Sequence, residues 1–204
     1  MHGLYIVTPD WDDTQKLLEI TELALKGGAA LVQYRHKTAA AALRREQAEC
    51  LLELCRSYSR PLVINDFVDL CLALDADGVH VGGTDAAVAA VRAAVGPDKI
   101  VGASCYGDLQ LARSAQAAGA SYVAYGGFYP SRVKKYPVTT PATIIAASRA
   151  EIALPVVVIG GMTVENAAPL VAGGADMVAA ISSVYLAADP QLAAGKFAAL
   201  FAAR

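Results

Sequence analysis

Eight short apolar runs alternate with eight longer amphipathic runs along this chain, and the alternation predicts an α/β fold with a parallel sheet. Eight such units in succession favour closure into a barrel over an open, doubly wound sheet. The chain has 204 residues, a length at which one barrel of this class forms a single domain. We therefore expect residues 1–204 to form one (β/α)8 TIM barrel.

The expected strands are short and rich in β-branched residues, as buried parallel strands are. They cover residues 4–8, 30–35, 62–65, 78–81, 100–104, 122–126, 156–160 and 177–182. The expected helices are longer and rich in alanine and leucine. They cover residues 14–26, 40–57, 68–74, 86–95, 109–118, 141–151, 164–171 and 190–203. Glycine or another small residue precedes several strands, where a helix must stop and the chain must turn.

Charge and hydropathy exclude several classes of partner. The chain has 17 Lys and Arg against 19 Asp and Glu, a formal charge of -2, which gives no reason to expect a nucleic acid or an anionic membrane as partner. Mean hydropathy is +0.41, but no uninterrupted apolar stretch approaches the ~20 residues that cross a bilayer. We expect a soluble protein that binds small molecules. The sequence leaves the oligomeric state open, including a homo-oligomer.

The cysteines are informative about the cellular compartment. Cys50, Cys55, Cys71 and Cys105 lack the paired spacing of metal and redox motifs. Three of them fall in apolar segments, so buried free thiols are favoured over metal ligands or a disulfide framework. The first residues have the pattern of a strand, without the basic segment and cleavage site of a secretory signal. These features predict a reducing cytoplasm.

Polar side chains gather where the second expected strand ends. Gln33, Arg35 and Lys37 occur at every second position, and the strand period of two sends them to one side. Two cations and an amide suit a polyphosphate better than a single carboxylate, since guanidinium is a planar fork and ammonium a point charge. For this segment alone, a strand end with solvated charges is the alternative.

Two carboxylates follow the next two strands. Asp66 comes directly after Asn65 at the end of the third strand, and Asp85 follows the fourth. The carboxyl ends of parallel strands meet at one mouth of a barrel, and Mg²⁺ prefers a few carboxylates completed by substrate phosphate and water. Either residue alone could instead cap the following helix. The magnesium interpretation depends on the pair taken together with the basic strand.

Glycines and cations mark the later strand ends. Residues 158–163 and 180–183 lie at the ends of the seventh and eighth strands, where the loops of barrels often bind phosphate through backbone N–H groups. Residues 125–136 form a long loop with glycine, proline and clustered cations, which would bring Arg132 or Lys134 onto bound phosphates if it closed over the mouth. A flexible basic surface loop is the alternative.

Two residues of the fourth and fifth strands remain. Ser104 offers a hydroxyl to the same mouth, but no histidine and aspartate arrangement supports a role as nucleophile. His80 lies inside the fourth strand, and we interpret it as a packed, hydrogen-bonded core residue.

Several segments spread over nearly the whole chain resemble those of one family, the thiamine phosphate synthases. They are residues 4–10, 33–37, 64–69, 78–82, 102–104, 129–130 with Lys134, 159–163 and 181–182. The resemblance implies a β/α barrel that joins hydroxymethylpyrimidine diphosphate to a thiazole phosphate, giving thiamine phosphate and pyrophosphate. The mechanism it implies is dissociative, with the diphosphate leaving before the thiazole nitrogen attacks.

The resemblance also implies roles for individual residues. The pyrimidine substrate and its diphosphate would be bound by Gln33, Arg35, Lys37, Asn65, Ser104 and Lys134. Mg²⁺ would be bound by Asp66 and Asp85. The thiazole phosphate would contact Gly161, Ile181 and Ser182, with Ser131, Arg132 and Val133 in the long loop. Arg35, Lys37 and Lys134 would be the catalytic groups, because they neutralise charge on the leaving diphosphate together with the metal.

The chain departs from the family pattern in three places. Ser131-Arg132-Val133 stands where a Thr-rich turn is usual, Gly83 stands where Gln is usual, and His36 replaces a commonly acidic residue. A related branch, the thiazole tautomerases, shares the thiazole phosphate pocket but does not need the diphosphate and metal residues, which this chain has. A barrel that only binds thiazole or thiamine phosphate is a further, non-catalytic alternative.

Overall fold

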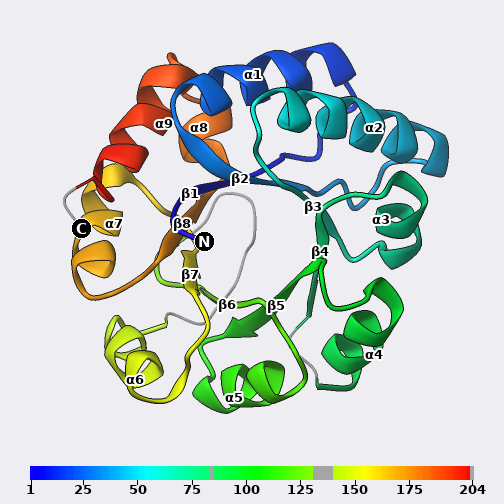
Figure 1. The fold of residues 1–204 in the computed structure, drawn as a ribbon. Helices are drawn as coiled ribbons and strands as arrows, with labels where there is room; N and C mark the ends of the chain where they lie inside the picture. Colours follow the sequence, from blue (N-terminus) through cyan, green and yellow to red (C-terminus); the bar gives the residue numbers. More distant parts are fainter. Residues whose placement is uncertain (83–84, 131–139, 203–204) are drawn as a thin grey trace.

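The computed structural model describes residues 1–82, 85–130 and 140–202, without the side chains of residues 85–87. Its strands close into a parallel barrel in chain order, with β8 paired to β1 (Figure 1). They are β1 (Gly3–Val7), β2 (Ala29–Tyr34), β3 (Leu62–Asn65), β4 (Gly78–Gly82), β5 (Ile100–Tyr106), β6 (Tyr122–Gly126), β7 (Val156–Ile159) and β8 (Met177–Ala180). The predicted fold class is confirmed.

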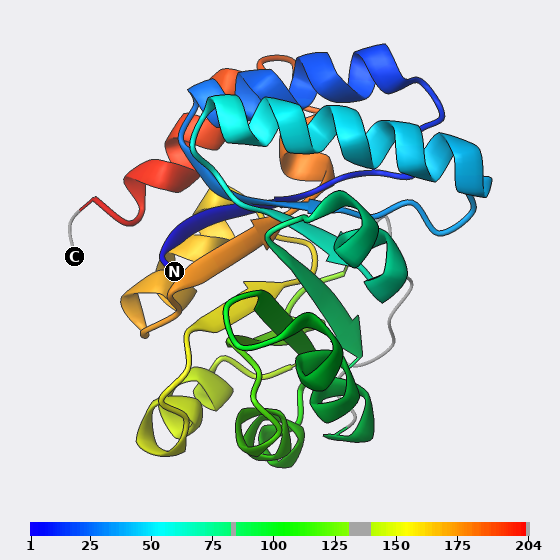
Figure 2. The ribbon, with the colours of Figure 1, turned by 45° about the vertical axis from the view of Figure 1, so that its right-hand side comes forward.

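The helices surround the barrel and cover the outer face of its strands (Figure 2). They are α1 (Thr14–Lys26), α2 (Ala41–Ser57), α3 (Val68–Leu74), α4 (Asp85–Val95), α5 (Leu109–Ala117), α6 (Thr143–Glu151), α7 (Val164–Ala172), α8 (Ser182–Tyr185) and α9 (Pro190–Ala199). The short helix α8 was not predicted. The pattern predicted a strand through residue 182, but β8 ends at Ala180 because Ile181, with φ -117° and ψ -86°, leaves the extended conformation.

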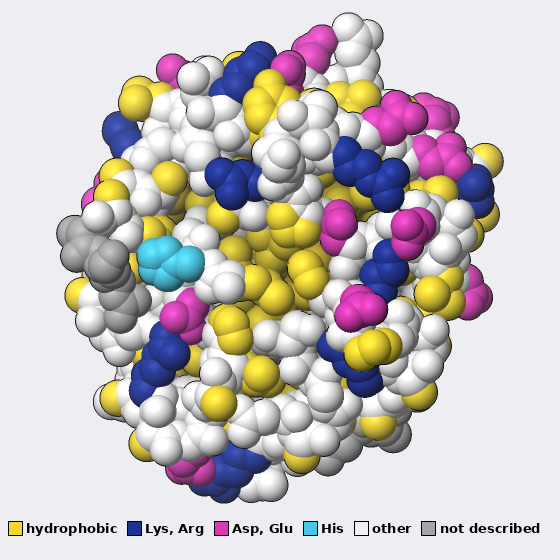
Figure 3. Space-filling model, in the orientation of Figure 1, with side chains coloured by type: hydrophobic (Ala, Val, Ile, Leu, Met, Phe, Trp, Pro, Cys, Tyr) yellow, Lys and Arg dark blue, Asp and Glu magenta, His cyan; other side chains and the backbone are white. Residues whose placement is uncertain are grey.

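The core has two layers because successive strand residues point to opposite faces of the sheet. One layer fills the barrel itself and includes Tyr5, Leu31 and Tyr122. The larger layer lies between the strands and the helices. Figure 3 shows the face of the molecule that Figure 1 presents. Hydrophobic side chains lie at the centre of this face, and charged side chains lie around them.

The cysteines confirm the prediction of free thiols. All four are free, and Cys55, Cys71 and Cys105 are buried. Burial raises the pKa of the Cys55 thiol to about 12, which keeps it protonated and unreactive at neutral pH.

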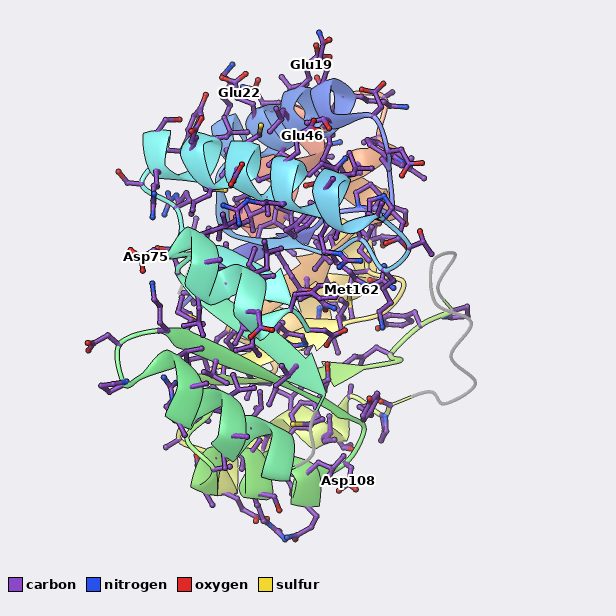
Figure 4. All side chains as sticks on the ribbon, turned by 90° about the vertical axis from the view of Figure 1, so that its right-hand side faces the viewer. Glu19, Glu22, Glu46, Asp75, Asp108 and Met162 are labelled. Carbon is purple, nitrogen blue, oxygen red and sulfur yellow. The ribbon has the colours of Figure 1, made fainter. Side chains whose placement is uncertain are left out.

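The two ends of the barrel differ in which loops they carry. In Figure 4, Asp75, which precedes β4, lies at the left edge of the molecule, whereas Met162, which follows β7, lies on the right-hand side of the barrel. The loops that leave the carboxyl ends of the strands therefore share the end marked by Met162, where enzymes of this architecture bind their substrates. None of the described helices is both long enough and apolar enough to span a membrane.

Candidate active site

Two adjoining pockets open at the carboxyl ends of the strands. The first, called here the polar pocket, is lined on its polar side by Tyr5, Gln33, Arg35, Lys37, Asn65, Asp66 and His80. The second, the glycine pocket, is lined by Gly126, Gly127, Tyr129, Gly160, Gly161, Met162, Ala180, Ser182 and Ser183. Both pockets share Ser104, Tyr106, Ala124, Ile159, Ala179 and Ile181. The structure thus brings together most of the predicted site residues, on the two sides of one cavity.

Arg35 is held in the wall of the polar pocket by its backbone and its side chain. The buried Thr8 hydroxyl accepts a hydrogen bond from Arg35 N at 2.8 Å and donates one to Arg35 O at 3.0 Å. Arg35 Nη1 lies 3.1 Å from both carboxylate oxygens of Asp10. Among the described residues, the buried Nε of Arg35 has no hydrogen-bond partner. This cation is therefore fixed in place in the pocket wall, where a charge-assisted hydrogen bond to an anionic ligand is strong.

Asp66 has an unusual backbone conformation at the end of β3. Its φ is +64°, a region that residues other than glycine enter at a cost of about 1 kcal/mol or more. Asp66 N donates to His80 O at 2.9 Å, and Asn65 Nδ2 donates to Asp66 Oδ2 at 2.7 Å. Lys37 Nζ lies 3.8 Å from the same oxygen. The strain is stored where a half-exposed carboxylate turns toward the polar pocket, as is common at functional sites.

The described side chains supply only one of the two carboxylates predicted to bind a magnesium ion. Asp66 supplies a hard, accessible carboxylate of the kind that Mg²⁺ prefers. Asp85 is the first residue of α4, but its side chain lies outside what the structure describes. No group of three His, Cys, Asp or Glu able to hold a metal ion occurs among the described residues. Mg²⁺ usually needs fewer protein ligands than that, because substrate phosphate and water complete its shell.

Ser104 lines both pockets and contacts His80, which lines the polar pocket. Ser104 Oγ lies 2.8 Å from His80 Nε2, and His80 Nδ1 lies 2.9 Å from the Tyr122 hydroxyl. The prediction that His80 is a buried, hydrogen-bonded residue is confirmed. The same residue also lines the polar pocket, which the prediction from sequence did not include.

The glycine pocket depends on backbone that leaves no room for side chains. Gly160 and Gly161 have φ of +119° and +61°. A Cβ atom at Gly161 would lie 2.3 Å from Pro130 O, and one at Gly160 would lie 2.7 Å from Gly127 N. The loop after β7 therefore packs directly against the loop after β6, and Tyr129 N donates to Gly160 O at 3.2 Å.

Two helices begin at the edge of the glycine pocket. Thr163 caps α7 in a reciprocal capping box with Asn166. The Ser183 hydroxyl donates to Met162 O and ties the start of α8 to the loop after β7. The first N–H groups of a helix have no partner within the helix. Ile181 and Ser182, which were predicted to contact a phosphate, lie at such a start and line the pocket.

Three residues at the site had no predicted role. Tyr106 lines both pockets and has a φ of +54°, beside an irregularity in the register between β5 and β6. Tyr129 lines the glycine pocket and donates to Asn166 O at 3.2 Å. Asp10 pairs with Arg35. Asp10 and Tyr129 stood in segments that resemble the family but were given no role, and the only signal for Tyr106 was its place two residues after Ser104.

The predicted loop contacts lie outside the part of the chain that the structure describes. These residues are Ser131, Arg132, Val133 and Lys134. Their roles stay predictions, as does the role of the Asp85 carboxylate.

Comparison with known proteins agrees with the geometry. The model of the thiamine monophosphate synthase family matches residues 4–184. Over 202 residues the chain is 72% identical to the thiamine-phosphate synthase of Janthinobacterium sp. (strain Marseille), which covers 99% of this chain and 98% of the relative. It is 49% identical to the thiamine-phosphate synthase of Methylobacillus flagellatus, over 98% of this chain and 96% of the relative.

A solved structure gives the same result at the level of the fold. Thiamine phosphate pyrophosphorylase from Pyrococcus furiosus superposes with a TM-score of 0.82 at 31% identity, over 97% of this chain and 94% of that one. The chain belongs to the thiamine monophosphate synthase family.

Proposed function

We propose that the protein joins hydroxymethylpyrimidine diphosphate to thiazole phosphate, releasing pyrophosphate and forming thiamine phosphate. The observation that carries this proposal is the pair of adjoining pockets. We call the residues that line both pockets their shared floor. The polar pocket offers Arg35, Lys37 and Asp66 to a diphosphate and its metal. The glycine pocket offers backbone to a second, smaller anion. Two anionic substrates that meet at one carbon need such a site.

The leaving group determines the chemistry of the polar pocket. The bond from the pyrimidine methylene carbon to the diphosphate oxygen breaks, and its electron pair departs with pyrophosphate. Arg35 and Lys37 stabilise the charge that develops there, and Lys134 would join them from the loop. Mg²⁺ held by Asp66 and Asp85 would supply Lewis-acid stabilisation of the same oxygens, which is worth several kcal/mol.

The shared floor determines what happens to the carbon left behind. The lone pair of the thiazole nitrogen forms the new C–N bond, so this step needs no general base. Ala124, Ile159 and Ile181 lie between the two pockets and are apolar. Apolar walls exclude water, which would otherwise compete with the thiazole for the electrophilic carbon.

The test is an omission series on the purified protein. Pyrophosphate release is measured with the pyrimidine diphosphate, thiazole phosphate and Mg²⁺ together, and then with each left out in turn. Release that requires all three, with thiamine phosphate formed, supports the proposal. Isomerisation of thiazole phosphate without Mg²⁺ would favour a tautomerase instead, and binding without turnover would favour a binding barrel. The free thiols support a cytoplasmic location for this reaction.

A further inference from the structure

A chain of hydrogen bonds crosses the interior of the barrel beneath the polar pocket. Gln33 Nε2 donates to the Tyr5 hydroxyl, which lies 2.7 Å from the Tyr122 hydroxyl. The Tyr122 hydroxyl lies 2.9 Å from His80 Nδ1, and His80 Nε2 lies 2.8 Å from Ser104 Oγ. These five residues come from five different strands. We call them the buried relay.

Four members of the buried relay line the polar pocket, and the fifth lies in the core. Gln33, Tyr5, His80 and Ser104 line the pocket, although Tyr5 is only 1% exposed, and Tyr122 is 0% exposed. Polar groups in such a place cost stability unless each is hydrogen-bonded. Apolar side chains in the barrel core would not carry this cost. The buried relay therefore connects two ligand-facing groups through the part of the protein where hydroxyls are least expected.

The packing around the middle of the relay reserves space for it. The rings of His80 and Tyr122 stack, with centroids 5.6 Å apart and an interplanar angle of 17°. Gly102 lies on β5 beside them, and a Cβ atom there would be 2.1 Å from Tyr122 Cζ and 2.6 Å from His80 Nδ1. Any other residue at this position would separate the two rings. Gly102 is thus explained by the relay and not by a turn.

The hydrogen bonds of the relay can run in only one direction at a time. Each tyrosine hydroxyl has one proton, and a neutral imidazole has one donor and one acceptor nitrogen. The amide nitrogen of Gln33 donates to Tyr5 and cannot accept, so the acceptor that the described residues offer to the buried Tyr5 proton is the Tyr122 hydroxyl. The Tyr122 proton then goes to His80 Nδ1, which leaves the His80 proton on Nε2. Burial raises the pKa of both tyrosines, so their hydroxyls stay protonated.

The consequence appears at Ser104. With the proton on Nε2, His80 is the donor to Ser104 Oγ, 2.8 Å away, and the serine proton is then directed away from His80. We propose that the buried relay holds His80 in its Nε2-protonated neutral form and thereby makes Ser104 a hydrogen-bond donor to the ligand in the polar pocket. The complementary ligand atom is an acceptor, such as an unprotonated ring nitrogen. Tyr5, Tyr122 and His80 are positioning residues, since they act through Ser104.

The tautomer of His80 tests the relay without any substrate. The protein has three histidines, so nitrogen-15 labelling of histidine gives a simple NMR spectrum, and His80→Gln identifies the His80 signals. We expect the Nε2-protonated pattern in the wild type. Tyr122→Phe removes the donor to Nδ1 and should mix the two tautomers. A wild-type His80 protonated on Nδ1 would overturn the proposal, because the relay would then run the other way.

Kinetics test what the relay does, and this part rests on the proposed function. Tyr122→Phe should raise KM for the pyrimidine diphosphate about tenfold, the effect of one hydrogen bond, and change KM for thiazole phosphate less than twofold. Tyr125→Phe is the matched control, because Tyr125 lies on the same strand and its buried hydroxyl donates to Ser148 at 3.1 Å, outside the relay. The control should change neither KM nor the His80 tautomer.

The remaining outcomes separate the two proposals. Tyr122→Phe with unchanged tautomer and unchanged KM overturns the relay. If that variant does not fold, Tyr5→Phe removes the donor to Tyr122, and the His80 tautomer alone is then compared with the wild type, because Tyr5 itself lines the polar pocket. A wild type with the expected tautomer, altered by either variant, but without turnover would support the relay and overturn the proposed function.

Discussion

The polar pocket and the glycine pocket are built by opposite means. Strands β2 to β5 end in side chains that carry charge or donate hydrogen bonds, and these form the polar pocket. The loops after β6 and β7 bring glycine backbone together so closely that no side chain fits. Under the proposed function, the polar pocket binds its ligand through charged and polar side chains, and the glycine pocket binds its ligand through exposed backbone. Different substitutions should therefore break each pocket.

The largest expected effect is on the polar side, at Asp66. Asp66→Asn keeps the size of the side chain, and asparagine tolerates the left-handed conformation seen here. The variant should fold normally but lose about 3 kcal/mol or more of transition-state stabilisation, roughly a hundredfold in turnover with Mg²⁺. Steady-state kinetics across a magnesium titration, beside a thermal melt, measures both.

The matched control is Asp69→Asn, three residues further on. Asp69 is exposed in the first turn of α3, and its loss removes the same charge from the same neighbourhood. It should leave turnover within about twofold of wild type, as most surface substitutions do. Equal losses in the two variants would assign the effect to general charge and remove Asp66 from the metal site.

The second effect is on the glycine side, at Gly161. Gly161→Ala places a methyl group 2.3 Å from Pro130 O at a φ of +61°, so the two loops must move apart. We expect KM for thiazole phosphate to rise by about tenfold to a hundredfold, equal to ~1.4 to ~2.8 kcal/mol, while KM for the pyrimidine diphosphate changes little. A rise in both constants by the same factor would show that the two pockets do not bind independently.

A smaller effect is expected at Lys37, on the rim of the polar pocket. Lys37 and Asp66 are 55% and 48% exposed, and such ion pairs contribute at most about 1 kcal/mol to stability. Lys37→Ala should leave the melting temperature almost unchanged and raise KM for the pyrimidine diphosphate severalfold. Lys26→Ala, which removes the exposed pair with Glu22 on α1, is the control. An equal kinetic effect from both would contradict a role for Lys37.

The contrast between the pockets also explains how far the sequence could predict this site. Gln33, Arg35, Asn65 and Asp66 were predictable as a group, because the carboxyl ends of neighbouring parallel strands meet at one mouth, although each residue alone could be a solvated strand end or a helix cap. The eight strands were predictable because each is marked by a local run of apolar, β-branched residues. Helix α8 was not, because four residues are too few to show a helical period.

The buried relay was predictable only in fragments. His80 could be expected to find hydrogen bonds, but its partners Tyr122 and Ser104 are 42 and 24 residues away. Only closure of the barrel shows that Tyr5 and Tyr122 meet inside it. The roles of the glycines could not be predicted for a related reason. The sequence does not show which atoms surround Gly102, Gly161 and Gly195 in the folded chain, and these surroundings differ.

The smallest expected effect separates a structural glycine from those of the mouth. Gly195 lies inside α9, and the nearest atom to a Cβ there is Gly27 O at an ordinary 3.7 Å. Glycine within a helix costs about 0.5–1 kcal/mol relative to alanine, so Gly195→Ala should raise the free energy of unfolding by up to that amount in urea titrations. Both KM values should stay unchanged, because α9 contributes nothing to either pocket. A loss of stability would mean that α9 packs on the end of α1 too tightly for a methyl group. A change in KM would instead mean that the glycine pocket senses α9 through α8, so that its geometry is not set by the two loops alone.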